Sequence, residues 1–243
     1  MSNSANLTPE QLKAIDDILG DKKQDSSFVE VEVPTQCKWY DTDSIKLRPF
    51  NFEDEKAALN PTNKNKNFLN FMLERCMEGI DIDSLYLVDR NYLAFKLKEI
   101  STGSNVTADI ECTKCGRKGN LDIDLNILSV KSLDAELPLE VQLPEIGKTA
   151  KIMPPKVREE EYILGVDLLY NNIWRFVSEV GGVSDSMVIT SVIEQLPVQD
   201  IHTILKAIGM SEYGMQNEIN YACGCGNEQV VEVPLSENFF GDN

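Results

Sequence analysis

Four cysteines occur in two close pairs, and their spacing is typical of metal binding. The first pair, Cys112-Thr-Lys-Cys115, has the C-x2-C spacing of a zinc knuckle, and a glycine directly follows each pair. Such a turn directs two sulfurs to one point, and two turns together supply the four thiolates of a closed structural zinc site. We therefore predict one structural zinc ion per chain, bound by Cys112, Cys115, Cys223 and Cys225.

The second pair leaves other interpretations open, because Cys223-Gly-Cys225 is one residue shorter than the usual knuckle. A turn of that length supplies two ligands only with altered geometry. Without a metal, the cysteines are either reduced thiols that remain after its loss or a redox-active pair. A redox CxxC normally begins a helix in a βαβ unit, whereas we expect these turns between strands. Zinc binding therefore depends on whether the two turns meet.

No other set of residues in the sequence fits an enzyme. The single histidine, His202, falls in an amphipathic helix pattern without a second histidine to assist it. The chain has neither a P-loop nor a GxGxxG pattern, so phosphate and dinucleotide binding are not indicated. Hydrolysis by a serine, a cysteine or a metal requires a set of partner residues that the sequence does not offer. We predict no catalytic residues, no organic cofactor and no small-molecule substrate.

The two cysteine pairs belong to a longer pattern that occurs twice in the chain. When Cys115 is aligned with Cys225, the alternating run 121–125 falls on 231–235 without a gap. A repeat of about 110 residues indicates a duplicated domain, because solenoid repeats span only about 20 to 50 residues. We therefore expect a pseudo-twofold molecule in which each half contributes one cysteine pair.

An amphipathic helix pattern that opens with an aspartate precedes each cysteine pair. Asp89 lies 23 residues before Cys112, and Asp200 lies 23 residues before Cys223. Aspartate is favoured at the N-cap of a helix, where its side chain accepts hydrogen bonds from backbone N–H groups. We predict that both aspartates are N-caps.

These patterns predict an internally duplicated α+β fold. Residues 1–27 form an N-terminal amphipathic helix and a linker, 28–130 a first repeat with the CxxC turn, and 131–243 a second repeat with the CxC turn and a C-terminal aromatic tail. In each repeat, a β-hairpin entry precedes helices and a zinc-ribbon-like hairpin that carries the cysteines.

Two further helices are expected between the entry strands and the Asp89 helix of the first repeat. In the helix predicted at 66–78, Cys76 shares an apolar face with Leu69 and Leu73, so we expect it to be a core thiol. The acidic stretch 52–55 opens the other helix. Acid clusters transfer protons in some catalytic clefts, but the helix macrodipole favours acids in a first turn. We interpret these acids as structural.

Three apolar segments are candidates for the core or for contact with partners. The dense apolar run 162–177 is predicted to form the main core. The helix 9–19, which Thr8 caps, is marginal alone and packs either on its own body or on a partner subunit. The aromatic pair Phe239-Phe240 docks into a groove of the same chain or of a neighbour.

The charge of the chain excludes some classes of partner. The 40 acidic and 23 basic residues give a formal net charge of −17. Nucleic-acid-binding proteins display clustered Lys and Arg, so we expect no nucleic acid. The acidity indicates either a solvated acidic surface or a basic protein partner. No apolar run reaches the roughly 18 residues of a membrane span, and the first residues lack a signal-peptide pattern. We expect a cytoplasmic protein whose cysteines stay reduced or bind metal.

Taken together, the order of these motifs resembles the baseplate hub protein family of T4-type contractile-tailed bacteriophages. The segments that carry the resemblance are Val31-Glu-Val-Pro34 with Tyr40, Ile45-Lys-Leu-Arg-Pro49, 52–55, Leu87-Val-Asp89-Arg90-Asn91, 100–103, 112–116, Leu196-Pro-Val-Gln-Asp200, 223–226, Val233-Pro-Leu235 and 239–240. The resemblance covers roughly residues 28–240. Two departures stand out: Cys37 occupies a turn position where glycine is expected, and the second cysteine turn is shortened.

The resemblance implies a structural or assembly role in the baseplate hub, without catalysis. It implies binding to other baseplate hub, tail-tube or tape-measure proteins, with self-association left open. It also implies a place in the virion tail, reached by assembly in the host cytoplasm. An incorporated hub subunit and a transient assembly factor are not separated by these motifs. The alternative function is that of a cytoplasmic zinc-ribbon adaptor or regulatory binding protein.

Overall fold

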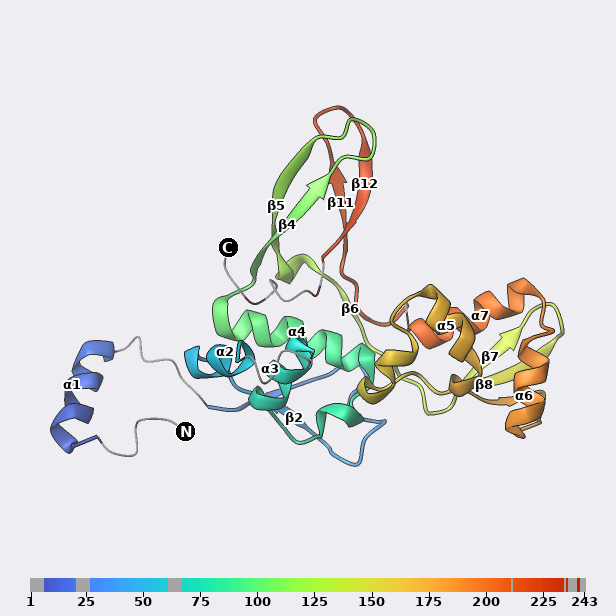
Figure 1. Cartoon of the computed structure of the whole chain (residues 1–243), viewed down its shortest axis with the longest axis horizontal. Coiled ribbons are helices and arrows are strands. Elements are labelled where there is room, and N and C mark those ends of the chain that lie inside the picture. The colour runs from blue at the N-terminus through green and yellow to red at the C-terminus, as the bar shows by residue number, and fades with distance from the viewer. Residues whose placement is uncertain are drawn as a thin grey trace.

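The computed structural model describes residues 7–20, 27–60, 67–210, 212–233, 235 and 240. The chain forms two bodies of mixed helix and strand, and a pair of β-hairpins projects from between them (Figure 1). This confirms an α+β fold. One helix, α1 (Pro9–Leu19), stands apart from both bodies in Figure 1.

The first half builds a three-stranded antiparallel sheet in the order β1-β2-β3, with helices between its second and third strands. Its elements are β1 (Val29–Val31), β2 (Ile45–Leu47), α2 (Phe52–Ala58), α3 (Phe68–Cys76), β3 (Met77–Glu78), the 3-10 helix η4 (Ile82–Ser84) and α4 (Leu87–Thr102). The predicted helix at 66–78 is wrong at its end. Met77 and Glu78 pair with β2 instead, because Met77 lies opposite Leu47 in the sheet.

The second half builds a sheet with the same strand order and the same antiparallel pairing, β7-β8-β9. Its elements are β7 (Leu139–Leu143), β8 (Lys148–Ile152), the 3-10 helix η6 (Val157–Tyr162), α5 (Val166–Asn172), the 3-10 helix η7 (Ile173–Phe176), β9 (Val177–Val180), α6 (Ser186–Ile193) and α7 (Val198–Gly209). The long helix α7 follows the third strand, as α4 follows β3 in the first half.

The projecting arm consists of two antiparallel hairpins that lie side by side (Figure 1). The first hairpin joins β4 (Asn105–Glu111) to β5 (Lys118–Asp124), and the second joins β11 (Glu218–Ala222) to β12 (Glu228–Glu232). At their base, the 3-10 helix η5 (Leu125–Ile127) precedes β6 (Val130–Lys131), which pairs with β10 (Gly214–Met215). The segments that lead out of one hairpin and into the other are therefore hydrogen-bonded to each other.

The larger hydrophobic core lies in the first half, so the prediction that 162–177 forms the main core is wrong. Helices α3 and α4 supply much of the first core, together with residues from the base of the arm. In the second half, a smaller core forms where Ile204 and Ile208 of α7 pack with the sheet and with Ile173 and Phe176 of η7. Helix α5 has no fully buried residue, and its Leu169 is partly buried against this core.

The two chain ends behave differently. Helix α1 has the predicted capping box, in which Thr8 accepts from the Gln11 backbone and Gln11 accepts from the Thr8 backbone. It buries no residue on its own body, and Ile18 is 81% exposed. Phe240, in contrast, is buried beside the rings of Phe50 and Phe68, which confirms docking on the same chain. Its neighbour Phe239 lies outside the described residues.

Asp89 is not an N-cap, so that prediction is wrong. Tyr86 occupies the N-cap position of α4, and Asp89 lies buried in the first helical turn. Its carboxylate accepts hydrogen bonds from the Thr35 backbone N–H at 3.1 Å, the Thr35 hydroxyl at 2.6 Å and the Tyr40 hydroxyl at 2.6 Å. Burial raises the pKa of Asp89, and these hydrogen bonds oppose the rise. The carboxylate thus anchors the turn between β1 and β2 to the helix.

Asp200 has the equivalent role in the second half, and its predicted N-cap role is also wrong. Pro197 occupies the N-cap position of α7, and Asp200 is fully buried. Its carboxylate accepts from the backbone N–H groups of Glu145 at 2.9 Å and Ile146 at 3.3 Å. Glu145 falls on Thr35 in the alignment that superposes Cys225 on Cys115. Each half therefore uses one buried carboxylate to fix its first turn against its long helix.

Asp54 is a third buried carboxylate, and it is more than an acid of the first helical turn. It completes a capping box with Asn51 at the start of α2. It also accepts from Arg48 at 2.7 Å and from Arg75 Nε at 2.8 Å. Burial acts to raise the pKa of Asp54, but the bonds from Arg48, Asn51 and Arg75 outweigh it and lower the pKa. The stretch 52–55 is structural, as interpreted from the sequence.

Hydrogen-bond donors of the turn contact both carboxylate oxygens of Asp89 and of Asp200, so each aspartate should need two acceptor oxygens. We predict that Asp89→Asn and Asp200→Asn each lower the free energy of unfolding by about 1 to 3 kcal/mol, because an amide NH2 set against a buried donor leaves both unsatisfied. Urea unfolding followed by circular dichroism measures the change. Asp109→Asn, at an exposed position of β4, is the control and should change stability by less than about 0.5 kcal/mol. Equal small losses at all three positions would contradict the anchoring role.

The Asp54 ion pairs predict a pH dependence of stability. A carboxylate whose pKa is lowered on folding stabilises the fold above its ordinary value of 3.8, and this contribution is lost as the pH falls through the lower, folded pKa. Asp54→Asn should cost about 3 kcal/mol at neutral pH, because it leaves two arginines without their charge partner. The difference between wild type and variant should shrink below the ordinary carboxyl pKa. A difference that stays constant down to acidic pH would be incompatible with this assignment.

Candidate metal centre

The tips of the two hairpins bring the four predicted cysteines together. The Sγ atoms of Cys112, Cys115, Cys223 and Cys225 all lie within 4.8 Å of one another. Both of the closest distances cross from one hairpin to the other: 3.7 Å between Cys112 and Cys225, and 3.8 Å between Cys115 and Cys223. The two turns therefore meet, although they lie in opposite halves of the sequence.

These distances fit a tetrahedral metal site. A zinc–thiolate bond of about 2.3 Å places the sulfurs of a regular tetrahedron about 3.8 Å apart. The same sulfurs are too far apart for a disulfide, whose bond is about 2.05 Å, and all four are free thiols. Four soft thiolates suit zinc, copper(I) or iron. The cluster could therefore hold a metal ion, and its donors leave no ligand position open.

Both turns close in the same way despite their different lengths. In the first turn, the Cys112 N–H donates to the Arg117 carbonyl at 2.9 Å, and the Gly116 N–H donates to the Cys112 carbonyl at 2.9 Å. The shorter turn repeats both bonds at 2.8 Å, from Cys223 to Asn227 and from Gly226 to Cys223. Gly116 and Gly226 have positive φ angles of 67° and 80°, a conformation that favours glycine. The positive φ angle that each turn requires therefore explains why a glycine follows each cysteine pair.

Side chains of the second hairpin also bind the first. Gln229 donates to the Glu111 carbonyl at 3.0 Å and accepts from the Thr113 backbone N–H at 3.0 Å. Asn227 donates to the Cys112 sulfur at 3.7 Å and to the Thr113 hydroxyl at 3.2 Å. These bonds fix the relative position of the two tips independently of any metal. The sequence analysis did not identify Gln229 or Asn227, because their partners lie in the other hairpin.

The pKa values of the thiols reflect their closeness. Hydrogen bonds from the backbone N–H groups of Cys115 and Lys114 lower the pKa of Cys112 to about 6. The Asn227 N–H favours the Cys225 thiolate, but desolvation and hydrogen bonds with the other three thiols outweigh it and raise the pKa of Cys225 to about 12. One thiolate therefore forms readily, while another resists ionisation beside it. A bound cation would favour ionisation of both thiols, because a metal ion deprotonates the thiols that coordinate it.

The remaining cysteines and the histidine lie outside the cluster. Cys76 is buried in the first core, as predicted. Burial is the main cause that raises the pKa of Cys76 to about 12, and the charge of Asp54 is the second. Cys37 has a positive φ of 57°, which accounts for glycine being expected at its position. His202 is exposed on α7. Within the described parts of the chain, only the four clustered cysteines form a group that could bind a metal.

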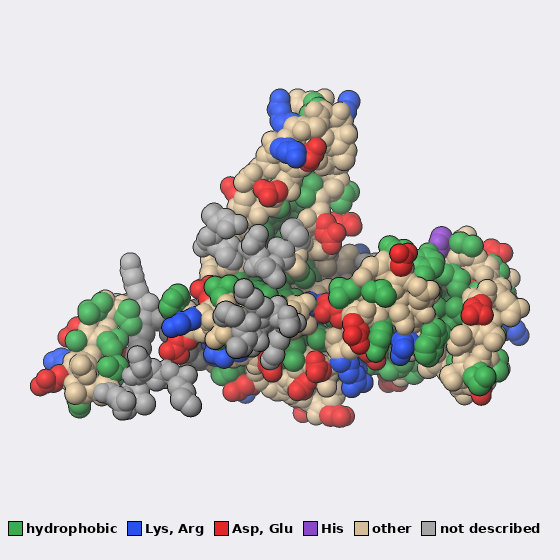
Figure 2. Space-filling model, in the orientation of Figure 1, with side chains coloured by type: hydrophobic (Ala, Val, Ile, Leu, Met, Phe, Trp, Pro, Cys, Tyr) green, Lys and Arg blue, Asp and Glu red, His purple; other side chains and the backbone are tan. Residues whose placement is uncertain are grey.

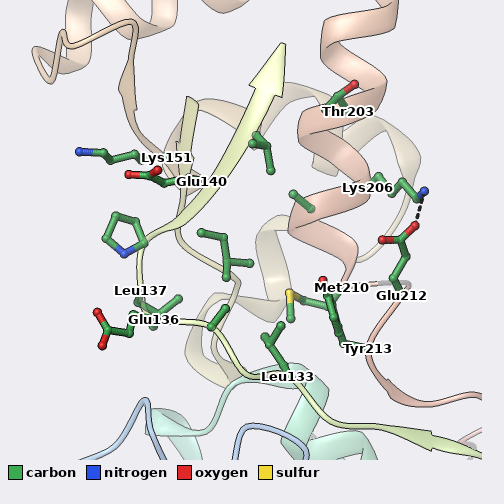
Figure 3. A pocket seen from close by; sticks show the side chains of 15 residues that line it. Leu133, Glu136, Leu137, Glu140, Lys151, Thr203, Lys206, Met210, Glu212 and Tyr213 are labelled. Carbon is green, nitrogen blue, oxygen red and sulfur yellow. Dashed lines mark ion pairs between the residues drawn. The ribbon is translucent and has the colours of Figure 1, made fainter. Parts of the chain in front are cut away.

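A pocket lies away from the cysteines, between α7 and the segment that leads into β7 (Figure 3). Its volume is about 630 Å³. Leu137, Met210 and Tyr213 contribute apolar and aromatic surface, and Lys206 forms an ion pair with Glu212 at 2.5 Å at its rim. Its lining contains neither a cysteine nor a histidine. The pocket therefore lacks the residues of a Cys–His or Ser–His catalytic pair.

Comparison with known proteins places the first half in a phage context. Residues 29–139 match the family model of the T4 bacteriophage base plate protein. The match runs from β1 to the start of β7, so it includes α4 and the first cysteine hairpin. It supports a structural role in a T4-type phage baseplate in the virion tail, among other phage structural proteins.

Other comparisons add no further relative. Neither the curated proteins nor the solved structures include a match to the chain. In the described parts of the protein, every helix is too short or too polar to span a membrane.

The cysteine cluster predicts a metal stoichiometry of about one ion per chain. Cys115→Ser removes one of four ligands and should abolish most of the bound metal in native-purified protein, measured by elemental analysis. It should also lower the melting temperature, because metal binding is linked to folding. Cys37→Ser is the matched control, since this thiol lies outside the cluster, and it should keep the metal. Metal-free wild-type protein would leave the four cysteines as ordinary thiols.

Proposed function

We propose that this chain is a structural or assembly component of the baseplate hub of a T4-type phage tail, and that it acts by binding other proteins without catalysis. The observation that carries the proposal is the family match over 29–139. The motif order that resembles the hub family continues beyond this stretch, to the second cysteine turn and the aromatic tail. Its partners on this proposal are other hub, tail-tube or tape-measure proteins.

We propose that the four cysteines hold one structural zinc ion and that the two halves arose by duplication. A site with four protein thiolates has no position open for a substrate, so the zinc stabilises the arm and performs no chemistry. The two sheets share their strand order, and the two buried aspartates bind equivalent turns. These similarities support an internal repeat of 28–130 and 131–243. The zinc joins the repeats at the tips of their hairpins.

The surface of the second half supports a binding role. Helices α5 and α6 expose large apolar side chains, and green patches cover much of this half in Figure 2. Val166 is 72% exposed and Met187 is 80% exposed. Interfaces that assemble permanently are richer in apolar residues than the free surface of a monomer. A protein that becomes enclosed among other tail proteins would bury such side chains on incorporation.

Incorporation into the particle tests this function. In cells infected with a phage that encodes this chain, an antibody against it should detect the protein in purified tails or in baseplate intermediates. Presence in finished tails identifies a hub subunit, and presence in intermediates alone identifies an assembly factor. A known tail-tube protein is the positive control for each fraction. Absence from every tail fraction would overturn the proposal and favour a cytoplasmic zinc-ribbon adaptor.

A further inference from the structure

Helices α1 and α2 each expose an apolar stripe that is two helical turns long. On α1, Leu12, Ile15 and Leu19 are exposed, and the helix buries no residue. On α2, Phe52 is 76% exposed, and Leu59 at the C-cap is 72% exposed. Single exposed apolar residues are ordinary on a protein surface, but an apolar stripe along a helix normally faces a packing partner.

The two stripes have the same spacing and opposite charges beside them. The apolar residues that begin and end each stripe are seven positions apart. In each helix, a charged residue lies four positions after the first of these and three positions before the second, which places the charge next to both on the helix surface. This residue is Asp16 in α1 and Lys56 in α2. The stripes are therefore complementary in charge and equal in length.

The stripe of α2 lines an open groove with a volume of about 400 Å³. The apolar stripe of a second helix fits such a groove by interleaving its side chains. Antiparallel packing brings together the residues that lie on the same side of two stripes, so it sets Asp16 beside Lys56. The apolar contacts in this orientation are Leu19 with Phe52 and Leu12 with Leu59.

The chain that joins α1 to the first sheet is long enough to reach this groove. Nine residues lie between Leu19 and Val29, and a fully extended chain of that length spans about 30 Å. Val29 pairs with Leu47 at the end of β2, and Phe52 follows Leu47 by five residues. Phe52 therefore lies at most about 25 Å from Val29, because neighbouring strands are about 5 Å apart. In Figure 1, α2 lies at the end of the first half that faces α1.

We propose that the groove along α2 is a binding site for α1 of the same chain, and that α1 closes over it as a strap. The structure shows α1 in the open position, apart from the body (Figure 1). Closure covers both apolar stripes and pairs Asp16 with Lys56. The tether gives α1 a high local concentration at this groove, which favours the same chain over a second copy. The contact spans only two helical turns, so α1 remains able to leave the groove for another partner.

Hydrogen exchange of the full chain, followed by mass spectrometry, tests the strap. A helix of 11 residues is marginal in water by itself, so the amides of α1 exchange fast unless the helix is docked. We expect Leu59→Ser to speed exchange in residues 12–19 by about 10-fold relative to wild type, because it removes a docking contact. Leu164→Ser is the matched control. It removes an exposed leucine of the second half and should leave exchange in α1 unchanged.

Charge reversal tests the antiparallel orientation. Asp16→Lys and Lys56→Glu each place like charges together in the closed strap, so each variant alone should speed exchange in α1. The double variant restores opposite charges and should return exchange to the wild-type rate, because residues in contact are not additive. Effects of the two single variants that simply add in the double variant would overturn the predicted contact.

Protein concentration separates binding within one chain from binding to a second copy. Exchange in α1 that stays the same over a roughly 10-fold dilution supports closure within the chain, because an intramolecular contact does not follow mass action. Protection that is lost on dilution would place α1 on a second copy and overturn the proposal. Unprotected α1 in wild-type protein, or equal exchange in wild type and Leu59→Ser, would also overturn it.

Discussion

The convergence of four sulfurs from two hairpins is the constraint on which the arm depends. Each hairpin has only two strands, and an isolated two-stranded hairpin is marginally stable in water. The tips are held together by Gln229 and Asn227 across the turns, and the bases are held by the pairing of β6 with β10. Between these points, the sulfurs approach to 3.7 and 3.8 Å. Segments from opposite ends of the fold must therefore be in place before the cluster exists.

A second constraint operates inside each half. Asp89 and Asp200 are both fully buried in the first turn of a long helix, and each binds backbone N–H groups of the turn between the first two strands. The details differ, because Asp89 also receives two hydroxyl groups and Asp200 receives two backbone N–H groups. Buried carboxylates are tolerated only with such donors. Each half therefore uses a buried aspartate to hold the turn between its first two strands against its long helix.

The two halves differ in how completely their apolar side chains are buried. Phe240 returns to the first half and packs beside Phe50 and Phe68, whereas α5 in the second half has no fully buried residue. A baseplate component needs surfaces that stay accessible until its neighbours arrive. On the proposed function, the first half is the stable body, the arm fixes the relation between the repeats, and the second half with α1 is available to partners. The acidic surface keeps such a protein soluble before assembly.

The sequence alone determined the features that depend on local chemistry. Cysteine spacing identified the four sulfurs that meet, glycines marked the turns, and Thr8 predicted the start of α1, because turns and caps involve residues only a few positions apart. The tertiary structure decided what depends on distant segments. Aspartate is a common N-cap residue, but Asp89 and Asp200 bind a turn that is distant in the sequence. Met77 pairs with Leu47 in the sheet and does not continue α3. The run 162–177 is apolar enough for a core, yet only Ile173, Phe176 and Val177 of this run are fully buried, in the smaller second core. Asn227 and Gln229 have partners only in the opposite hairpin. No local pattern encodes a contact between segments so distant in the sequence.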